Sequence, residues 1–348
     1  MRIAIDGRLI NKSQNTGISR YTEYLINYYL ERYHDSDLFL ITNDHTISYK
    51  GVSSVYCEHK PFGLFGFLRF SKFVKNLSVD LLHSPFYSGL VTPIKGTKNI
   101  VTTHDLMYRL VPGFFGRNGF VSYLKIKYFN FIVQNSLKNS TQIISVSETT
   151  QKDVAKVYQL NSVHIPEESD VGTELDITIL KRYNLETKSY FFYCGNNRPH
   201  KNIEFIAEIF SANANFPTLV LAGNGHHSRS NVVATGVVSE EELRALYTHA
   251  IAFVFPSKYE GFGLPVLESL RCKTIVVASD IPAFNEFRSN NILFFKEGDK
   301  QEFIRAIDTA QIKGYVDEPL FFNSYGKKKI YQLLDQLIQV VLNDRERK

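Results

Sequence analysis

Apolar segments of strand type alternate with amphipathic segments of helix type along the whole chain, and this alternation constrains the fold most strongly. The first strand-type segments are RIAID, LFLIT, VDLLHSP, NIVTTHD and TQIISVS. After a polar stretch, 166–188, the pattern restarts with YFFYCG, TLVLAG, VVATG, IAFVFP, TIVVAS and ILFF. Strands that alternate with helices are typical of a parallel sheet covered on both faces. The sequence therefore predicts an α/β protein with two Rossmann-like domains.

The chain length agrees with two domains, because 348 residues exceed the ~250–300 residues that one core usually holds. We predict an N-terminal domain over 1–166 and a C-terminal domain over 167–324. The final segment, about 325–348, has the pattern of an amphipathic helix. Ligands of open α/β sheets bind beyond the carboxyl ends of the strands. We therefore expect the functional motifs at strand ends, facing a cleft between the domains.

Composition and termini suggest a cytoplasmic protein. Hydrophobic residues make up 44% and charged residues 22% of the chain, as in ordinary globular proteins. No run approaches the ~18–20 apolar residues of a membrane-spanning helix. The N-terminal MRIAID enters a strand directly, so we expect no signal peptide. Cys57, Cys194 and Cys272 are too far apart in sequence to suggest a disulfide framework or a metal motif.

Two stretches, 59–79 and 106–147, contain no acidic residue. The first is rich in phenylalanine, and the second contains five basic residues: Arg109, Arg117, Lys125, Lys127 and Lys138. Basic residues interleaved with exposed aromatic residues suit an anionic membrane surface or a lipid-linked, phosphate-bearing substrate. In the alternative interpretation the aromatic residues belong to the core. Nucleic acid is disfavoured as a partner, because no nucleic-acid-binding module is recognisable.

The segment KYEGFGLPVLESL follows a strand and enters a helix. Pro265 suits the first helical turn, and Gly261 and Gly263 would let the backbone approach a ligand closely. We expect Glu268 in the first turn, where the helix dipole favours a carboxylate that could accept two hydrogen bonds from a vicinal diol such as a ribose. Glu260, on the loop, could reach another part of the same ligand. The alternative, a capping acid and a surface acid, explains this clustering less well.

Other strand ends carry further candidate groups. In FFYCGNNRPHKN, Arg198 and Lys201 lie three residues apart at an expected helix start, where both could face a diphosphate; otherwise they form a solvated basic turn. His104 ends an apolar strand and could donate to a sugar hydroxyl or stabilise developing charge, or it could be structural. Gly17 precedes a helix whose N-terminus could bind a phosphate, or it is simply a turn residue.

These segments resemble glycosyltransferase family 4, whose members are retaining enzymes of the GT-B fold. EGFGLPVLE resembles the E-x7-E motif, within a longer stretch, SEEELRALYTHAIAFVFPSKYEGFGLPVLESL, that is similar to the family signature. YCGNNRPHKN resembles the segment with the phosphate-binding lysine, most closely in bacterial polysaccharide mannosyl- and rhamnosyltransferases. VTTHDL and IISVSETTQKDV are similar to N-terminal segments of that branch. FNSYGKKKIYQLL is similar to the final helix, which in the family crosses back to the N-terminal domain.

The resemblance implies a role for each candidate residue. Glu268 would bind the ribose hydroxyls and Lys201 the diphosphate, while His104 would contact the donor sugar near C6. Asn196 stands where many relatives carry arginine, and Arg198 could substitute for it. The implied catalytic residues are His104, Arg198, Lys201 and Glu260. The implied donor-binding residues are Gly17, Asn196, Lys201, Val238, Gly261, Phe262, Gly263, Leu264 and Glu268. No Asp-x-Asp metal site is evident, so we expect no metal ion and no other cofactor.

The implied activity is retaining, metal-independent transfer of a sugar from a nucleotide-diphosphate sugar, with GDP-mannose preferred over dTDP-rhamnose or a UDP-sugar. The acceptor would be a lipid-linked saccharide of a capsule, O-antigen or other surface polysaccharide, at the inner face of the cell membrane. No protein nucleophile is expected, and the diphosphate would take the acceptor proton. Two alternatives stay open: a UDP-N-acetylglucosamine 2-epimerase-like enzyme of the same fold, and a non-catalytic sugar-nucleotide-binding protein.

Overall fold

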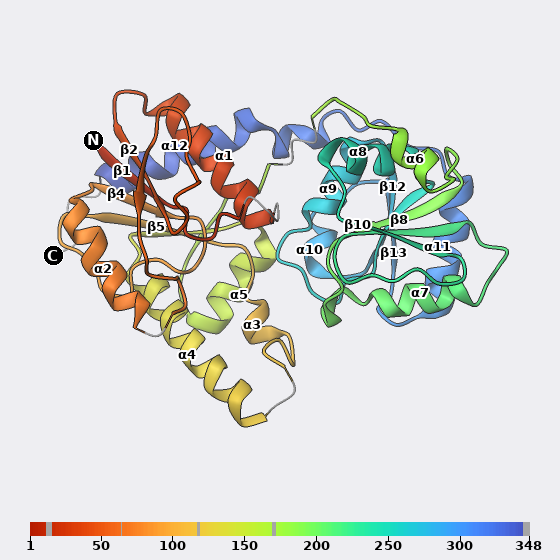
Figure 1. Ribbon diagram of the computed structural model, residues 1–348, viewed down its shortest axis with the longest axis horizontal. Helices are drawn as coiled ribbons and strands as arrows, with labels where there is room; N and C mark the ends of the chain where they lie inside the picture. Colours follow the sequence, from red (N-terminus) through yellow and green to blue (C-terminus); the bar gives the residue numbers. More distant parts are fainter. Residues whose placement is uncertain (12–15, 64, 117–118, 169–171, 344–348) are drawn as a thin grey trace. The chain divides into compact units, whose positions relative to one another are not determined.

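The structure is a computed structural model that describes residues 1–11, 16–63, 65–116, 119–168 and 172–343. The chain forms two compact units, each built on its own sheet (Figure 1). Unit 1 holds Met1–Glu167 and Lys327–Lys348, and unit 2 holds Glu168–Gly326. All strand pairs within the two sheets are parallel, and helices pack against both faces of each sheet. The predicted α/β architecture with two Rossmann-like domains is confirmed.

The sheet of unit 1 has seven strands in the order β3-β2-β1-β4-β5-β6-β7. Their bounds are β1 Arg2–Asp6, β2 Asp37–Thr42, β3 Ser53–Tyr56, β4 Leu81–Ser84, β5 Lys98–Thr103, β6 Gln142–Ser145 and β7 Val163–His164. The sequence pattern did not predict β3 and β7, which are the two edge strands. β3 is largely exposed, and β7 has only two residues, so neither forms the apolar run that marks a buried strand.

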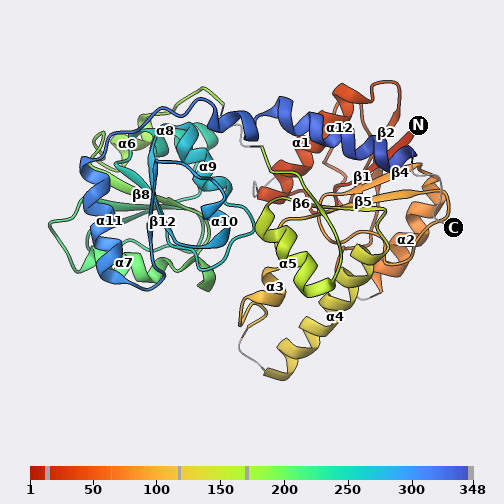
Figure 2. The ribbon, with the colours of Figure 1, turned by 180° about the vertical axis from the view of Figure 1, so that it is seen from behind.

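The helices of unit 1 divide between the two faces of its sheet (Figure 2). One face packs Ile3, Ile5 and Ile100 against α1 and α12, while the other packs Ala4, Leu82 and Val101 against α2, α4 and α5. Neighbouring strand residues point to opposite faces, which explains this alternation. The helix bounds are α1 Gly17–Arg32, α2 Gly66–Leu77, α3 Met107–Leu110, α4 Gly119–Lys138, α5 Glu148–Tyr158 and α12 Lys327–Asn343.

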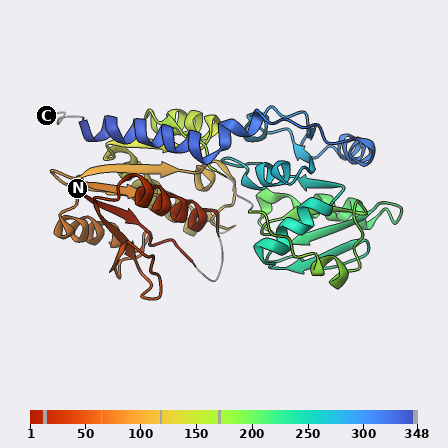
Figure 3. The same ribbon diagram turned by 90° about the horizontal axis from the view of Figure 1, so that it is seen from above.

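Helix α12, at the far end of the chain, packs on unit 1 (Figure 3). The Tyr331 ring lies edge-on to Tyr28 at a centroid distance of 4.9 Å, and Tyr28 donates a hydrogen bond of 2.8 Å to Asp335. The predicted final helix begins slightly later than expected, because Phe321–Tyr325 form a 3-10 turn before it. Residues 344–348 of that prediction lie outside the described residues, as does Arg117.

The sheet of unit 2 has six strands in the order β10-β9-β8-β11-β12-β13, and all six were predicted. Their bounds are β8 Tyr190–Cys194, β9 Thr218–Ala222, β10 Val232–Gly236, β11 Ala252–Phe255, β12 Ile275–Ser279 and β13 Ile292–Phe295. The helices are α6 Thr178–Arg182, α7 Ile203–Ser211, α8 Glu240–His249, α9 Leu264–Arg271, α10 Pro282–Asn285 and α11 Lys300–Ile312, with 3-10 turns η1 Pro199–Lys201 and η2 Phe321–Tyr325. Helix α6 lies in the stretch expected to be only a polar linker.

Capping chemistry fixes where several helices begin. Ser239 and Glu242 form a reciprocal capping box at the start of α8, and the Thr16 hydroxyl accepts a hydrogen bond from the backbone of Ser19 at the start of α1. Across the described ranges of the chain, no helix combines the length and the apolar character needed to cross a membrane.

Candidate active site

Two of the predicted motifs follow neighbouring strands of unit 2. Strand β8 pairs with β9 on one side and with β11 on the other, so the strand order reverses between β8 and β11. Segment 195–202 follows β8, and segment 256–268 follows β11. Because the carboxyl ends of parallel strands share one edge of the sheet, the two segments meet there. A reversal of strand order is where open α/β sheets usually bind ligands.

Lys201 and Glu260 form an ion pair at this edge. Lys201 Nζ lies 2.6 Å from Glu260 Oε1, and the two side chains are only 15% and 11% exposed. The same ammonium lies 5.0 Å from the centroid of the Phe255 ring. A lysine ammonium has three N–H donors, so the bond to Glu260 leaves donors for a bound anion. The structure thus brings together two residues that the sequence assigned to a donor-binding site.

The turn that carries Lys201 is fixed from the neighbouring strand end. The backbone N–H of Lys258 donates a hydrogen bond of 2.8 Å to the carbonyl of His200. Lys201 ends the 3-10 turn η1, and α7 begins two residues later, after Asn202 in a left-handed conformation at φ 56°. Burial, with a smaller contribution from the charge of Lys201, lowers the pKa of His200 to about 4. His200 is therefore neutral at pH 7, and Lys201 is the cation of the buried turn.

Three other predicted site residues follow strands of the same sheet. Arg198 and Asn196 occupy the exposed part of the turn, where the Arg198 backbone N–H donates to Asn196 Oδ1 at 3.3 Å. Val238 is half-buried after β10, directly before the N-cap Ser239 of α8. Strand β10 lies two places from β8 in the sheet. Val238 therefore shares the carboxyl edge but not the β8–β11 reversal.

Glu268 is buried in α9, with only 3% of its surface exposed. It is the fifth residue of the helix, so the expectation that it lies in the first turn was wrong. The helix begins at Leu264 because Gly263, at φ 110°, is the N-cap. The Tyr247 hydroxyl donates a hydrogen bond of 3.1 Å to Glu268 Oε2 and lies 2.8 Å from Cys194 Sγ. Tyr247 thus fixes one oxygen of the carboxylate, and it belongs to the quoted signature although it was not singled out.

In the glycine-rich turn before α9, the backbone conformation and the surrounding space both require glycine at position 263. Its positive φ disfavours other residues, and a Cβ there would lie 2.9 Å from the Phe284 ring. The resemblance implies donor contact through the backbone of Phe262; its ring packs against that of Phe287, with centroids 5.4 Å apart, and the residue is 7% exposed. Its backbone is the part that this turn can offer a ligand. Leu264 is half-buried, and Gly261 is buried beside Glu260.

His226 was not predicted, and it connects the loop after a third strand, β9, to the site. It lies on the loop after β9, and its Nε2–H donates a hydrogen bond of 2.8 Å to the carbonyl of Gly195. The contact links the loops that follow β8 and β9. No sequence signal marks it, because the two residues are 31 positions apart in irregular segments.

In unit 1, His104 directly follows β5 and is held by hydrogen bonds at both ring nitrogens. Nε2 lies 2.7 Å from the carbonyl oxygen of Pro85, and Nδ1 contacts Glu167 Oε1. Burial lowers the pKa of His104, but the Glu167 carboxylate and the Pro85 carbonyl outweigh it and raise that pKa above its ordinary value. Glu167 was not predicted, because 63 residues separate it from His104.

Gly17 is the exposed first residue of α1, one turn before Tyr21. The Tyr21 ring packs edge-on against His104, with ring centroids 4.8 Å apart. The start of α1 and His104 therefore lie near each other at the carboxyl edge of the unit 1 sheet. Among the residues that the structure describes, no group of three His, Cys, Asp or Glu residues is placed to hold a metal ion.

Domain models match both parts of the chain. The Glycosyltransferase Family 4 model matches residues 15–166, and the model for glycosyl transferases group 1 matches residues 177–328. Sucrose-phosphate synthase from Thermosynechococcus elongatus has a similar structure, with a TM-score of 0.73 over 99% of this chain and 100% of that chain. At 16% identity this similarity concerns the fold alone.

Curated relatives match part of the chain at low sequence identity. The O-antigen chain mannosyltransferase RfbU of Salmonella typhimurium is 28% identical over 251 residues, which cover 68% of this chain and 67% of that protein. The O-antigen chain mannosyltransferase B of Escherichia coli is 24% identical over 59% of this chain and 58% of that protein. A GDP-mannose:cellobiosyl-diphosphopolyprenol alpha-mannosyltransferase of Xanthomonas oryzae is 26% identical over 59% of this chain and 55% of that protein. The matched part thus spans two thirds or less of these relatives.

Two parallel sheets of seven and six strands, shared with the similar solved structures, give the chain the GT-B fold. The predicted resemblance is confirmed. The chain belongs to the glycosyltransferases that join a Family 4 domain to a group 1 domain, and it is an enzyme of that class.

Proposed function

We propose that the chain transfers mannose from GDP-mannose, with retention of configuration and without a metal ion, to a lipid-linked saccharide of a surface polysaccharide. The observation that carries this proposal is the Lys201–Glu260 ion pair at the reversal of strand order in unit 2, followed in the same segment by the buried Glu268 of α9. A cation for a diphosphate and a fixed carboxylate for a ribose are what a sugar nucleotide requires.

The relatives support the choice of donor and acceptor. Two of them are named as O-antigen chain mannosyltransferases, and the name of a third specifies GDP-mannose and a diphosphopolyprenol acceptor. The same comparison leaves dTDP-rhamnose and UDP-sugars as donors to be tested. Within the proposal, Glu268 holds the ribose, Lys201 and Arg198 face the diphosphate, and Glu260 orients the sugar.

Charge stabilisation of the leaving diphosphate is the chemical task of this site. Negative charge develops on the diphosphate as the sugar–phosphate bond breaks, and a cation already fixed in place stabilises it. Lys201 meets this requirement because Glu260 holds its ammonium at 2.6 Å. The proposal assigns no protein nucleophile, and the departing diphosphate takes the acceptor proton.

A donor panel tests the proposal. GDP-mannose, dTDP-rhamnose and UDP-glucose are each incubated with the protein, and release of nucleoside diphosphate is measured with and without a polyprenyl-diphosphate saccharide. We expect release from GDP-mannose above the other two, unchanged by EDTA, and an axial anomeric linkage in the product by NMR. Preference for another donor would refute the donor assignment, and loss of activity with EDTA would refute metal independence. An inverted linkage would refute retention of configuration.

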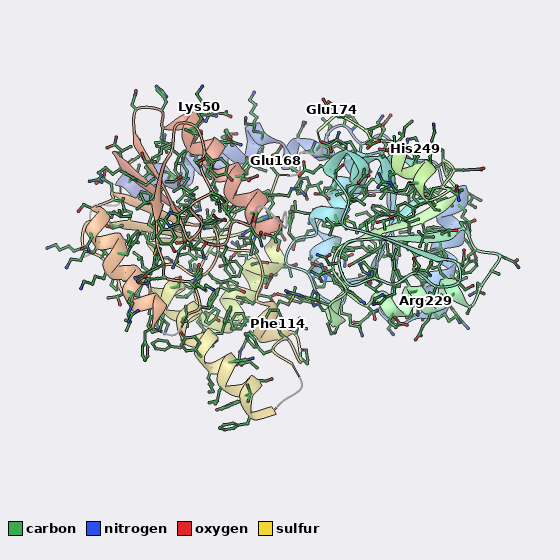
Figure 4. The ribbon with its side chains drawn as sticks, viewed as in Figure 1. Lys50, Phe114, Glu168, Glu174, Arg229 and His249 are labelled. Atoms are coloured by element: carbon green, nitrogen blue, oxygen red, sulfur yellow. The ribbon has the colours of Figure 1, made fainter. Side chains whose placement is uncertain are left out.

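We further propose that an apolar, basic surface on α2 and α4 contacts an anionic membrane. The two helices meet where the Phe67 ring lies 5.9 Å from that of Phe131, and the side chains of α4 stand out from unit 1 (Figure 4). The exposed apolar residues of this α2–α4 surface are Phe65, Leu68, Phe120, Val121, Tyr123, Leu124 and Phe131. Its exposed basic residues include Arg69, Lys72, Lys75, Lys125 and Lys127. Charge of this sign favours anionic lipid, and the acceptor's lipid would lie in the same membrane.

Vesicle sedimentation tests the α2–α4 surface. We expect binding to vesicles with anionic phosphatidylglycerol but not to neutral phosphatidylcholine, and weaker binding at high salt. The double variants Phe120→Ser/Leu124→Ser and Lys125→Glu/Lys127→Glu should both reduce binding. Ile312→Ser removes an apolar residue of unit 2 that is even more exposed, and it serves as the control. Binding that is indifferent to lipid charge, or equal loss in the control, would contradict the proposal.

A further inference from the structure

His104 and the three groups that fix it follow four neighbouring strands of unit 1. In the sheet order β4-β5-β6-β7, Pro85 follows β4, His104 follows β5, Thr150 lies in α5 after β6, and Glu167 follows β7. Pro85 and Glu167 contact the two ring nitrogens, and the Thr150 hydroxyl donates a hydrogen bond of 3.0 Å to the His104 carbonyl. Both the backbone and the ring of His104 are therefore held in place.

The two ring contacts determine the protonation of His104. A backbone carbonyl only accepts hydrogen bonds, so Nε2 must carry a hydrogen to bond Pro85. A carboxylate also accepts, so Nδ1 must carry a hydrogen when Glu167 is ionised. A neutral imidazole has one N–H only, whereas the imidazolium has two. With side chains 12% and 7% exposed, His104 and Glu167 form a nearly enclosed charge pair.

The charged and titratable groups that face the ring agree with this assignment. Glu167 lies on the Nδ1 side, and Asp105 is the next residue on the same loop; the negative charges of both raise the pKa of His104. From α1, Tyr21 presents a ring edge, and its hydroxyl is 3.1 Å from the Thr102 hydroxyl and not directed at His104. The Phe86 ring, with its centroid 6.3 Å away, is uncharged.

We propose that Glu167 is a positioning residue of the active site, which holds His104 as a cation in one orientation. The ring then acts as a fixed positive charge and not as a base, because neither nitrogen has a free lone pair. This inference rests on the proposed function, since such a charge serves catalysis where a diphosphate leaving group develops negative charge. It agrees with the proposed transfer of the acceptor proton to the diphosphate, because a doubly protonated ring accepts no proton.

Glu167 lies at the boundary between the two units of the chain. Glu167 is the last residue of the first segment of unit 1, and Glu168, labelled in Figure 4, is the first residue of unit 2. The residue that orients His104 therefore lies where the chain leaves unit 1. The neighbouring acid, Asp105, accepts a hydrogen bond at Oδ1 from the backbone of Met107.

Nitrogen-15 NMR of the imidazole rings tests the protonation directly. The His104 signals are assigned by their loss in His104→Gln. In the wild type we expect His104 to stay protonated well above pH ~6.5, the ordinary histidine value. In Glu167→Gln burial remains but the carboxylate charge is gone, so the midpoint should fall by at least about one pH unit. A neutral His104 at pH 7 in the wild type, or an equal midpoint in the variant, would overturn the proposal.

The pH dependence of kcat/KM for donor turnover tests the catalytic consequence. The wild type should show no loss attributable to His104 through neutral pH. Glu167→Gln should lose activity about tenfold per pH unit above its lowered midpoint, and Glu167→Asp, which keeps the charge, should restore most of it. Glu148→Gln, an exposed acid on α5, is the matched control. A uniform loss at every pH would indicate a merely structural role and reject the proposal.

The two measurements separate this inference from the proposed function. The NMR titration requires no donor, so the expected midpoints with no turnover of any donor would reject the proposed function alone. Turnover of GDP-mannose with identical pH profiles in wild type and Glu167→Gln would reject the positioning role alone.

Discussion

At the scale of single residues, Glu268 offers the most direct test of nucleotide binding. Replacement by alanine removes the carboxylate that we assign to the ribose, and it should weaken binding of GDP by about 10- to 100-fold, since a hydrogen bond to a charged group contributes ~1.5–3 kcal/mol. Tyr247→Phe keeps the carboxylate but removes the hydrogen bond of 3.1 Å that orients it, so we expect a smaller loss. Isothermal titration calorimetry measures both.

Glu208→Ala is the matched control for that experiment, because Glu208 is an exposed acid on α7 in the same unit. Its affinity for GDP should equal that of the wild type. If Glu268→Ala also binds GDP like the wild type, the ribose assignment is incorrect.

The Lys201–Glu260 pair gives two variants with opposite effects on anion binding. Lys201→Ala removes the cation and should lower turnover by at least ~100-fold, the cost of losing one fixed charge-stabilising donor. Glu260→Gln frees the ammonium from its counter-charge, so inorganic diphosphate should bind more tightly while turnover still falls. Calorimetry and steady-state kinetics measure the two quantities.

Folding must be checked in both variants, because removal of one partner leaves a nearly buried charge alone. Lys201→Ala should unfold at a lower temperature than Glu260→Gln, which keeps a neutral hydrogen-bonding partner. Weaker diphosphate binding in a folded Glu260→Gln protein would show that Glu260 contributes to the anion site rather than competing for it.

His83 predicts an acid-sensitive stability of unit 1. It is fully buried between the Tyr29 hydroxyl at 2.9 Å and the Thr102 hydroxyl at 3.1 Å, and burial lowers its pKa to about 3. The unfolded chain takes up this proton near pH ~6.5, so the stabilisation is complete above that pH and is lost as the pH falls towards 3. The slope approaches ~1.4 kcal/mol per pH unit.

Urea unfolding between pH 7 and pH 4 measures this slope. His83→Asn cannot titrate, so it should be less stable than the wild type at pH 7 but lose stability more slowly on acidification. His200→Asn controls for the second buried histidine, which lies in unit 2 and acts in the same direction. Equal slopes in wild type and His83→Asn would contradict the assignment.

At the scale of elements, α12 should contribute strongly to the stability of unit 1. Tyr331 is 3% exposed and packs edge-on against both Tyr24 and Tyr28. Tyr331→Ala should lower the free energy of unfolding by about 3–4 kcal/mol, as expected for a buried aromatic side chain. Gln332→Ala, exposed on the same helix, should change it by less than ~0.5 kcal/mol. Comparable losses in the two variants would refute the packing role of α12.

The sequence predicted elements well where they were buried and poorly where they were exposed. The six strands of unit 2 and five strands of unit 1 have apolar runs, and all were identified. The edge strand β3 was missed because its residues are exposed, and α6 was missed because five residues show no helical period. Glu268 was placed one turn too early, since the left-handed backbone of Gly263 sets where α9 begins.

At the scale of the whole molecule, the two units differ in whether they are formed by one continuous segment of the chain. Unit 2 is one continuous segment, whereas unit 1 needs both 1–167 and α12. We expect the fragment 168–326 to fold alone and to bind GDP, because its sheet, Lys201, Glu260 and Glu268 are complete within it. The fragment 1–167 should aggregate, since it lacks the helix that covers Ile3, Ile5 and Tyr28.

Circular dichroism, light scattering and calorimetry of the two fragments measure these outcomes. Adding a peptide of residues 327–343 to the fragment 1–167 should reduce its aggregation, and the same peptide with Tyr331→Ala should do so less. A monomeric, cooperatively folded 1–167 fragment without the peptide would contradict the expectation.

Long-range contacts limited the prediction of the site. The motif EGFGLPVLE and the turn with Lys201 lie within short segments, so residue types and spacing were sufficient to find them. The contact of His104 with Glu167 and that of Tyr247 with Glu268 join residues 63 and 21 positions apart. They depend on which strands are neighbours, and a strand order such as β4-β5-β6-β7 cannot be read from one sequence.

The late position of α12 has a consequence for how the protein is made. A ribosome releases residues 1–167 long before it reaches α12, and at ~5–20 residues per second the delay is on the order of 10–40 s. During that time one face of the first sheet lacks one of its two covering helices, while unit 2 can already fold. The usual order, in which the N-terminal domain matures first, is therefore reversed, and nascent chains should depend on chaperones that shield the exposed part of that face until α12 has been made.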